Sequence, residues 1–467
     1  MKKHFTQAIG GLLWLLAGAA QAQTFPVDTL IKNGPLTNRI NLVFVGDGYQ
    51  ASEMTTYLAD VNRAVSSLFQ QPPFTQYRQY FNVFAVRVVS AQSGTTHPRT
   101  ATDCSNSSLP VSAPTTYLRT TFDNNSVHRA IVTNGQAALG AVLAASFPRY
   151  TKAIVLVNTR EYGGTGGAVI TMTASTSAPE IMLHEMGHTF GLLADEYWPG
   201  PTYAAEKPNL TQFVNPPRWQ PWVGTGTIGA YPHAESPTWY RPHQNCKMRY
   251  LNAPFCNVCR ETLIESIHRY VRPVDAIAPD VPDLPNPGTD QLFSLTLLPP
   301  TPNTLRAKWR LDGAPLAGNV TQVLVPRAVL ATGFHTIEAE VLDTTLSSRS
   351  ATHRVQHRYL NSWDVYQTPT GTRLGTGSAE YTLETYPNPV ADALTLAYTL
   401  PRPAEVRLTL LDAAGRRLKT LNHGRQPAGT YTYRLLTAET LNLRTAGTYT
   451  LLLDIEGRLF SQPIVKE

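Results

Sequence analysis

Long apolar runs are scarce in this chain of 467 residues, and after the first segment none is long enough to cross a membrane as a helix. Residues 1–22 combine Lys2 and Lys3 with an apolar stretch and an Ala-Gln-Ala sequence ending at Ala22. This pattern is typical of a secretory signal peptide. The residue directly after Ala22 is Gln23 and not a cysteine, so a lipid anchor at the new N-terminus is not indicated. We therefore expect a secreted or surface-attached protein without a transmembrane segment.

Clusters of positive charge are also missing. The 39 Lys and Arg residues exceed the 33 Asp and Glu residues, which gives a net charge of +6, but the basic residues are scattered along the chain. Nucleic-acid-binding proteins concentrate such residues in a patch, so we expect no nucleic-acid partner. The glycine-rich run 162–167 is not followed by Lys-Ser/Thr and a helix start, which argues against a phosphate-binding loop and favours a loop without that function.

Cysteine is rare, with only Cys104, Cys246, Cys256 and Cys259. In an exported protein an even number first predicts disulfides, here two, whose pairing the sequence does not fix. Cys256 and Cys259 form a CxxC pair, which would be half of a structural zinc site or a redox pair. A zinc ribbon requires a second CxxC, and the sequence has none.

The segment from Thr24 to Val274 alternates between strand-like and helix-like patterns, which predicts an α/β domain. Apolar, β-branched runs predict strands at 41–45, 81–89 and 153–157. Helical spacing of apolar residues predicts helices at 52–70 and 127–145.

Beyond this domain the composition changes. Residues 277–288 contain four prolines in twelve positions, which indicates a stiff linker. Residues 289–365 show short alternating strands, such as 305–309 and 335–342, separated by turns such as Asp312-Gly313, and predict an immunoglobulin-like β-sandwich. The predicted parts are a signal peptide (1–22), an α/β domain (23–276), a linker (277–288), a sandwich (289–365), a Gly/Thr-rich linker (366–383) and a last all-β domain (384–467).

The stretch HEMGHTFGLLADEY at 184–197 carries the pattern HExxH. Ser177 as a cap and Gly191 as a stop predict a helix that starts near Ala178. One turn separates His184 from His188, so both imidazoles project from one face and can bind one metal ion. Glu185 lies beside them, where it can take a proton from a metal-bound water.

The third ligand is displaced from its usual place. HExxHxxG resembles the metzincin zinc peptidases, in which the third ligand would fall on Ala194, a residue that cannot bind metal. Asp195 follows, and its carboxylate is a suitable zinc ligand if the turn contains one extra residue. Glu196 could bind instead, with Asp195 orienting a histidine, or the ligand could be a distant residue: Glu206, His233 or His243.

Further motifs surround this stretch. The runs YGGTGG (162–167), EKPNLT (206–211), YRP (240–242) and CKMRYLNAPFCNVCRE (246–261) resemble the IgA-peptidase-like family of zinc metallopeptidases. The earlier runs INLVFVGDGY (40–49), FNVFAVRVVSAQSG (81–94) and TTFDNNSVHR (120–129) agree. The resemblance covers 24–274 in order. It implies a metzincin-like fold, zinc held by His184, His188 and Asp195, and Glu185 as catalytic base.

The resemblance also implies supporting residues. Met248 would form the methionine turn that packs beneath the zinc without touching it. Tyr250 follows Met248 by two positions, as does the tyrosine that assists the transition state in some metzincins, and Tyr240 is a second candidate; either could also be a buried structural tyrosine. Ala153–Asn158 would be the strand at the border of the cleft, on which an extended peptide lies.

The last segment carries a second resemblance. Tyr386-Pro-Asn-Pro389 is followed by LLDAAGRRL (410–418), PAGTYTY (427–433), LRTAGTYTLLL (443–453) and a short ending, IVKE. This order is similar to the C-terminal sorting domain of type IX secretion substrates. It implies that residues 384–467 are read by the type IX export machinery, which would carry the protein across the outer membrane.

These expectations combine into an α/β metzincin-like zinc peptidase domain followed by two all-β immunoglobulin-like sandwich domains. The predicted function is that of a secreted zinc-dependent endopeptidase acting on proteins or peptides, with Glu185 as general base. The competing hypothesis is a surface adhesin or glycan-binding protein with an inactive peptidase-like domain. The chain retains His184, Glu185, His188 and Met248, which argues against a peptidase domain that has lost its activity. The sequence does not identify the substrate.

Overall fold

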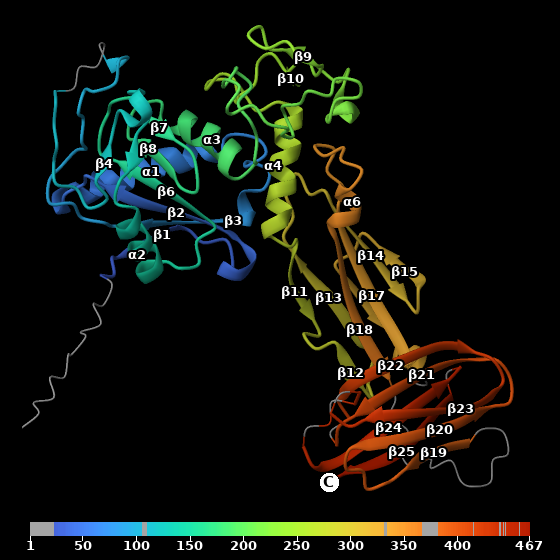
Figure 1. The fold of residues 1–467 in the computed structure, drawn as a ribbon. Helices are drawn as coiled ribbons and strands as arrows, with labels where there is room; N and C mark the ends of the chain where they lie inside the picture. The colour runs from blue at the N-terminus through green and yellow to red at the C-terminus, as the bar shows by residue number, and fades with distance from the viewer. Residues whose placement is uncertain are drawn as a thin grey trace, which may run out of the picture. The chain divides into compact units, whose positions relative to one another are not determined.

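The computed structural model describes residues 23–104, 110–330, 334–366 and 382–467, except 414, 439, 442, 444 and 457. The predicted signal peptide 1–22 and most of the predicted linker 366–383 lie outside this range. The chain consists mostly of β-strands in several sheets, with few helices (Figure 1). It divides into two compact units between Leu263 and Ile264, inside helix α4 (Asn257–Tyr270). No helix in the described ranges is long and apolar enough to cross a membrane.

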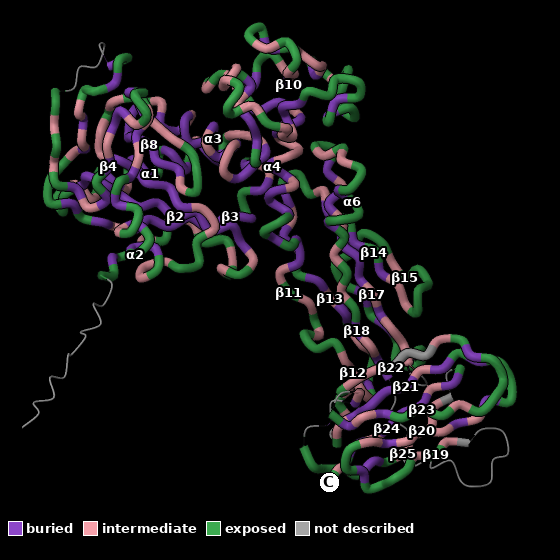
Figure 2. The backbone as a smooth tube through the Cα atoms, in the orientation of Figure 1, coloured by how far each residue is buried: buried purple, intermediate pink, exposed green. Residues whose placement is uncertain are grey.

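The first unit is built on a six-stranded sheet in the order β1-β3-β2-β6-β8-β7. Its strands are β1 (Val27–Ile31), β2 (Ile40–Asp47), β3 (Phe81–Val86), β6 (Lys152–Val157), β7 (Gly164–Thr165) and β8 (Ile170–Thr173). The four central strands are parallel, and β1 and β7 add antiparallel edges. The central strands are buried along their length (Figure 2), as parallel strands covered on both faces should be.

The larger helices of this unit are α1 (Met54–Leu68), α2 (Gln136–Ser146) and α3 (Ala178–Thr189). Alternate strand residues, such as Val43 and Val45, share a core with Leu139 and Val142 of α2. Helix α1 contacts α3. The predicted helix 127–145 is wrong in its first part, where β5 (Val132–Thr133) pairs with β4 (Thr120–Thr121) and the helix begins only after Gly135.

The expectation that 153–158 borders an open cleft is wrong. Strand β6 pairs with β2 on one side and β8 on the other, so it offers no free edge to a peptide. The reason is that the chain after the glycine-rich run 162–167 returns to the sheet as β8. The short strand β7 within that run forms the edge instead. A Cβ on Gly164 would lie 2.2 Å from Ile181 Cγ2, so β7 packs directly against α3.

The second unit begins with two facing sheets. One sheet contains β11 (Val274–Ala278), β13 (Gln291–Leu297) and β16 (Gln322–Val325), and the other contains β12 (Asp283–Pro285), β18 (Arg358–Tyr366), β17 (Phe334–Asp343), β14 (Leu305–Leu311) and β15 (Ala314–Gly318). The ring centroids of Phe293 and Trp363 are 5.2 Å apart, and Trp363 stacks on Trp309 in a core shared by the two sheets. Part of the predicted linker 277–288 forms β12, where prolines are tolerated because it is an edge strand.

The C-terminal part of this unit again has two sheets. Their strands are β19 (Thr382–Tyr386), β20 (Ala393–Leu400) and β23 (Gly429–Leu436), then β22 (Arg417–Gln426), β21 (Ala404–Leu411), β24 (Gly447–Ile455) and β25 (Arg458–Lys466). Leu396, Leu408 and Leu451 are fully buried in one core. The segment predicted to be all-β therefore consists of strands that pack side chains into a shared core.

A cluster of one half-buried carboxylate and two buried histidines lies in the second unit beside the single-turn helix α6 (His353–Gln356). Glu265 Oε1 lies 2.5 Å from His353 Nδ1, and its Oε2 lies 2.7 Å from His357 Nε2. Burial raises the pKa of Glu265, but the bonds from both histidines outweigh it and lower that pKa. Burial lowers the pKa of His353, and the bond to Glu265 offsets this and raises it.

This cluster predicts a local dependence on pH. The carboxylate contribution is present above the ordinary Glu pKa of about 4.3, and the imidazolium contribution is present below the ordinary His pKa of about 6.5. Protection against hydrogen exchange in 353–366 should therefore be greatest near pH 5–6 and should fall as the pH rises through the elevated pKa of His353. Exchange mass spectrometry at several pH values checks this. Equal pH dependence in Glu265→Gln would contradict the assignment.

Candidate active site

Helix α3 presents the HExxH residues. It begins at Ala178 as predicted, with Pro179 in the first turn, although the Ser177 side chain makes no capping hydrogen bond. Glu180, in the first turn of the helix, forms an ion pair with the buried Lys247. The chain turns after α3 at Leu192, which has a left-handed φ of 56°, and not at Gly191. This turn carries the following residues back toward the histidines.

His184, His188 and Asp195 come together in one group. The two Nε2 atoms are 3.1 Å apart, and Asp195 Oδ1 lies 3.1 Å from each of them. The three atoms thus form a nearly equilateral triangle. Zinc bonds of about 2.0–2.1 Å in a tetrahedron place neighbouring nitrogen and oxygen ligands about 3.3 Å apart. The donor set and its spacing therefore fit one face of a zinc site.

The other ring nitrogens fix the orientation of both histidines. His184 Nδ1 lies 3.0 Å from the Lys247 carbonyl, and His188 Nδ1 lies 2.9 Å from the Leu193 carbonyl. A carbonyl only accepts hydrogen bonds, so each Nδ1 carries the proton. In the neutral rings both Nε2 lone pairs then face the centre of the triangle. This is the arrangement in which histidine binds metal.

The electrostatics of the triangle favour a positive charge. Burial lowers the pKa of His188, but the hydrogen bond and charge of Asp195 reverse this and raise it to about 9. Burial raises the pKa of Asp195, and the hydrogen bonds from both histidines more than offset it, so the carboxyl pKa lies far below its ordinary value. Asp195 is therefore ionised and can serve as an anionic ligand.

Glu185 lies at a pocket beside this triangle. The pocket has a volume of about 370 Å³ and is lined by Arg129, Tyr162, Gly164, Ile181, His184, Glu185, Tyr197, Arg249 and Leu251. Burial raises the pKa of Glu185, while the histidines act in the opposite direction. A carboxylate with a raised pKa next to a metal-type site is suited to accept and return a proton.

Met248 is fully buried against α3. A Cβ on Gly187 would lie 2.3 Å from Met248 Sδ, so the sulfur packs directly on the helix backbone between the two histidines. Its carbonyl accepts a hydrogen bond from Glu196 N at 2.7 Å. The residue expected to form the methionine turn is thus placed under the HExxH helix.

The structure does not bring Glu196 to the histidines. Its side chain is fully buried in a separate group with Cys246, Cys256 and Cys259. The more distant residues also stand apart: Glu206 pairs with Arg218, and neither His233 nor His243 joins a metal-type group among the described residues. Of the candidate third ligands, only Asp195 lies at the histidine pair.

The expectation of two disulfides is wrong, because all four cysteines are free. Cys104 lies with His97, Asp123 and His128, and the other three cysteines lie together with Glu196. At most two of those three could pair, and Cys104 has no cysteine neighbour in its group. The even number of cysteines predicted disulfides. The sequence does not show which side chains lie together in the fold, so this prediction could not take their actual neighbours into account.

The two predicted tyrosines do not line the pocket. Tyr250 is half exposed and lies under Arg249, and Tyr240 belongs to the short strand β10 (Tyr240–Arg241), which pairs with β9 (Tyr231–Pro232). Tyr197 lines it instead, with its ring parallel to that of His184 at 6.5 Å. Burial, and then the charge of Asp195 and a hydrogen bond to it, raise the pKa of Tyr197. Its position two residues after Asp195 was the available sequence signal.

Comparisons with solved structures give only weak likenesses. Latent dimeric PorU from Porphyromonas gingivalis is 12% identical, with 39% of this chain and 19% of that chain covered and a TM-score of 0.16. A β-glucuronidase from Parabacteroides merdae is 9% identical over 50% and 28% of the two chains, with a TM-score of 0.16. SGBP-B from Bacteroides ovatus, solved with a mixed-linkage heptasaccharide, is 13% identical over 40% and 42%, with a TM-score of 0.14. Scores this low assign neither fold nor function.

No curated protein matches the chain. A family model does match one segment, from residue 29 to residue 235. That segment includes α3 and the whole triangle of His184, His188 and Asp195, and it ends before Met248. The family is described as IgA Peptidase M64, and the match of residues 29–235 to it supports a metallopeptidase.

Proposed function

We propose that this protein is a secreted zinc-dependent endopeptidase. The observation that carries the proposal is the triangle of two histidine nitrogens and one carboxylate oxygen, 3.1 Å apart, beside a pocket that contains Glu185. His184, His188 and Asp195 would hold the ion. Zinc bound there would supply a Lewis acid for the scissile carbonyl and would lower the pKa of a coordinated water to about 7.

The residues of the chain then have distinct tasks. Glu185 would accept a proton from the attacking water on its carboxylate and pass it to the leaving nitrogen. The Tyr197 hydroxyl, on the same pocket, would donate a hydrogen bond to the developing oxyanion. Tyr162 and Gly164 of the glycine-rich run would form one wall of the pocket, against which the peptide would lie.

The test is cleavage of a peptide library by the purified full chain, with products mapped by mass spectrometry. We expect cuts at internal bonds that disappear with a zinc chelator and return when zinc is restored. Cleavage that is indifferent to chelation would overturn the zinc assignment. Release of terminal residues alone would overturn the endopeptidase assignment.

The close approach of Gly166 to the proposed base gives a mutational prediction. A Cβ at this position would lie 2.1 Å from Glu185 Oε2. Gly166→Ala should therefore displace the carboxylate and lower kcat about 10–100-fold, with little change in Tm. Gly140→Ala is a matched control, because a Cβ there meets no atom within 4 Å. An unchanged kcat for Gly166→Ala would contradict the proposed position of the Glu185 carboxylate during catalysis.

We further propose that residues 384–467 act as a type IX sorting domain and that the protein reaches the cell surface or the medium. The ordered motifs from Tyr386 to the end support this, together with their arrangement on two sheets with a shared core. The test is fusion of 382–467 to an exported reporter. Surface delivery that depends on a functional type IX system is the expected result, and delivery in its absence would contradict the proposal.

A further inference from the structure

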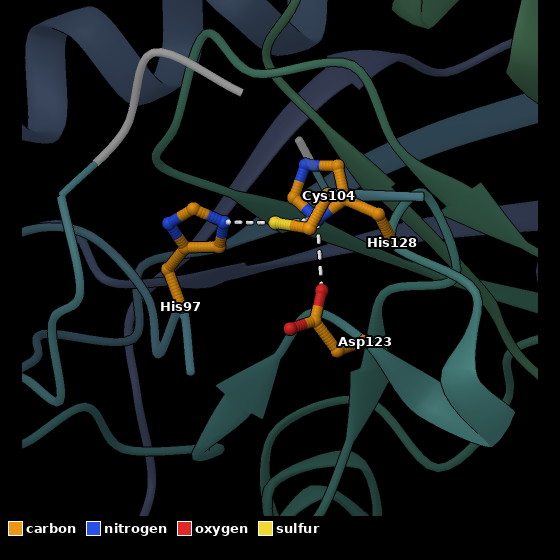
Figure 3. A group of neighbouring side chains, drawn as sticks. All are labelled: His97, Cys104, Asp123 and His128. Carbon is orange, nitrogen blue, oxygen red and sulfur yellow. Dashed lines mark hydrogen bonds and ion pairs between the residues drawn. The ribbon is translucent and has the colours of Figure 1, made fainter. Parts of the chain in front are cut away.

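A buried group of four polar side chains lies away from the histidine pair of α3. His97, Cys104, Asp123 and His128 each expose 9% or less of their surface, and one ligand-type atom of each lies within 4.8 Å of the others. Figure 3 shows the imidazole of His97 directed at the Cys104 sulfur and the Asp123 carboxylate directed at His128. Buried groups of this polarity need partners, because burial removes their water.

The distances within the group resemble those of a zinc site. Cys104 Sγ lies 3.4 Å from His97 Nε2 and 3.3 Å from His128 Nδ1. Tetrahedral zinc, with bonds of about 2.0 Å to nitrogen and about 2.3 Å to sulfur, places such atoms about 3.5 Å apart. Asp123 Oδ1 lies 2.8 Å from His128 Nδ1, a hydrogen-bond distance that a bound ion would lengthen.

The atoms that face outward already have partners. His97 Nδ1 lies 3.0 Å from the Pro110 carbonyl, and His128 Nε2 lies 3.4 Å from Glu161 Oε1. The second oxygen of Asp123 accepts hydrogen bonds from the amides of Thr100 at 2.6 Å and Ala101 at 3.3 Å. Histidine ligands of metals show this pattern, in which the outer nitrogen faces a carbonyl or a carboxylate. The inner atoms are left to converge on one point.

A catalytic triad does not fit the same residues. In a triad the nucleophile and the carboxylate contact opposite nitrogens of the imidazole. Here Cys104 Sγ and Asp123 Oδ1 both approach the same atom, His128 Nδ1. That nitrogen cannot relay a proton across the ring between them, so convergence on a cation is the better chemical description.

We propose that His97 Nε2, Cys104 Sγ, Asp123 Oδ1 and His128 Nδ1 bind a structural zinc ion, independent of the proposed catalytic zinc. One thiolate, two imidazoles and one carboxylate complete four-coordinate zinc without an open position, as in structural sites. The ion would cross-link the long segment between β3 and α2, whose described residues form the two-residue strands β4 and β5 and one short 3-10 helix, Asn124–Ser126.

This cross-link would also support the pocket. Arg129, next to His128, lines the pocket with Glu185, and its carbonyl accepts a hydrogen bond from Gly164 N at 3.0 Å. Loss of the ion should therefore loosen both the segment and one wall of the pocket.

The test uses the full chain and counts zinc by elemental mass spectrometry. We expect Cys104→Ser and Asp123→Asn each to lose one zinc ion per chain, with a lower Tm that no longer responds to chelator at this site. A serine hydroxyl can still donate to His97, so a cluster held by hydrogen bonds alone would keep both its Tm and its zinc count. Unchanged zinc in folded Cys104→Ser would overturn the proposal.

Two controls separate this site from the others. His188→Ala should remove the proposed catalytic zinc and leave this ion in place, so the two proposals fail separately. His243→Gln, a histidine outside the described metal-type groups, should change neither count. If the cysteine variant does not fold, an anomalous difference map of wild-type crystals above the zinc edge decides. A peak between the four atoms is expected, and no peak there contradicts the proposal.

A second buried group carries an independent inference. Cys259 Sγ lies 3.6 Å from Cys246 Sγ and 3.1 Å from Glu196 Oε1, and Cys256 Sγ lies 4.0 Å from the same oxygen. Glu196 Oε2 is buried without a hydrogen-bond partner. An unsatisfied carboxylate oxygen among three thiols is costly, and three thiols cannot all pair as disulfides.

We infer that these three cysteines and Glu196 bind another structural zinc ion. The site takes the CxxC pair as two ligands and replaces the missing second CxxC with Cys246 and a carboxylate. It would fix the loop that carries Asp195 to the turn of Met248, since Glu196 N also donates to the Met248 carbonyl.

Thiol mapping tests this inference. The wild-type chain is unfolded with chelator but without reductant, alkylated and mapped by peptide mass spectrometry. We expect Cys246, Cys256 and Cys259 all to be alkylated and Cys256→Ser to lose one zinc ion per chain. A disulfide between any two of the three, or an unchanged zinc count in folded Cys256→Ser, would contradict it.

Discussion

Replacing Glu185 by glutamine should lower kcat for peptide hydrolysis about 10²–10⁴-fold while zinc content and Tm stay close to wild type. The substitution keeps the shape of the side chain and removes only its capacity to carry a proton between water and the leaving nitrogen. The carboxylate is half-buried, lines the pocket and is not part of the ligand triangle, so the metal should remain. Steady-state kinetics on a mapped peptide, with elemental analysis, measure both effects.

Glu235→Gln serves as the matched control, because Glu235 is exposed and does not line the pocket among the described residues. It should retain wild-type kinetics. Undiminished hydrolysis by Glu185→Gln would exclude this carboxylate as the base. A loss of zinc in Glu185→Gln would instead place the residue among the ligands.

Replacing Asp195 by alanine should remove one zinc ion per chain and abolish hydrolysis. Its Oδ1 completes the triangle with the two Nε2 atoms and is the only anion in it. Without that charge the two histidines should hold zinc more than about 100-fold more weakly, a larger effect than the 10–100-fold typical of residues that only orient a ligand. Zinc retained after dialysis against a chelator, together with kcat, measures this.

Glu206→Gln is the control for the loss of a carboxylate nearby in the chain. Glu206 pairs with Arg218 and is absent from the triangle, so its zinc count and activity should not change. Full zinc occupancy in Asp195→Ala would mean that another residue completes the site. The result thus distinguishes Asp195 from every other candidate for the third ligand.

The central strands were predictable because buried parallel strands are written in the sequence as continuous apolar runs. Residues 41–45 and 153–157 therefore fall inside β2 and β6. Pairing order was not predictable in the same way. The glycine-rich run carries no hydrophobic period, so nothing local showed that it would form the edge strand β7 and leave β6 in the interior.

Local pattern alone determined the HExxH helix, the one-turn spacing of His184 and His188, and Glu185 beside them, because helical periodicity puts residues four apart on one face. Only the tertiary structure decided which carboxylate meets them. Adjacent residues point in different directions: Asp195 lies at the histidines, and Glu196 lies among three cysteines.

The same reason separates the four cysteines. Counting them predicted disulfides, but a side chain's neighbours depend on distant segments. Cys104 lies beside His97, which precedes it, and beside Asp123 and His128, which follow it. Cys246 lies beside Glu196, which is 50 positions earlier in the chain. The sequence by itself determined the chemistry of the helix, and the tertiary structure decided which residues elsewhere could share a metal ion, because ligand sets form by convergence in space and not along the chain.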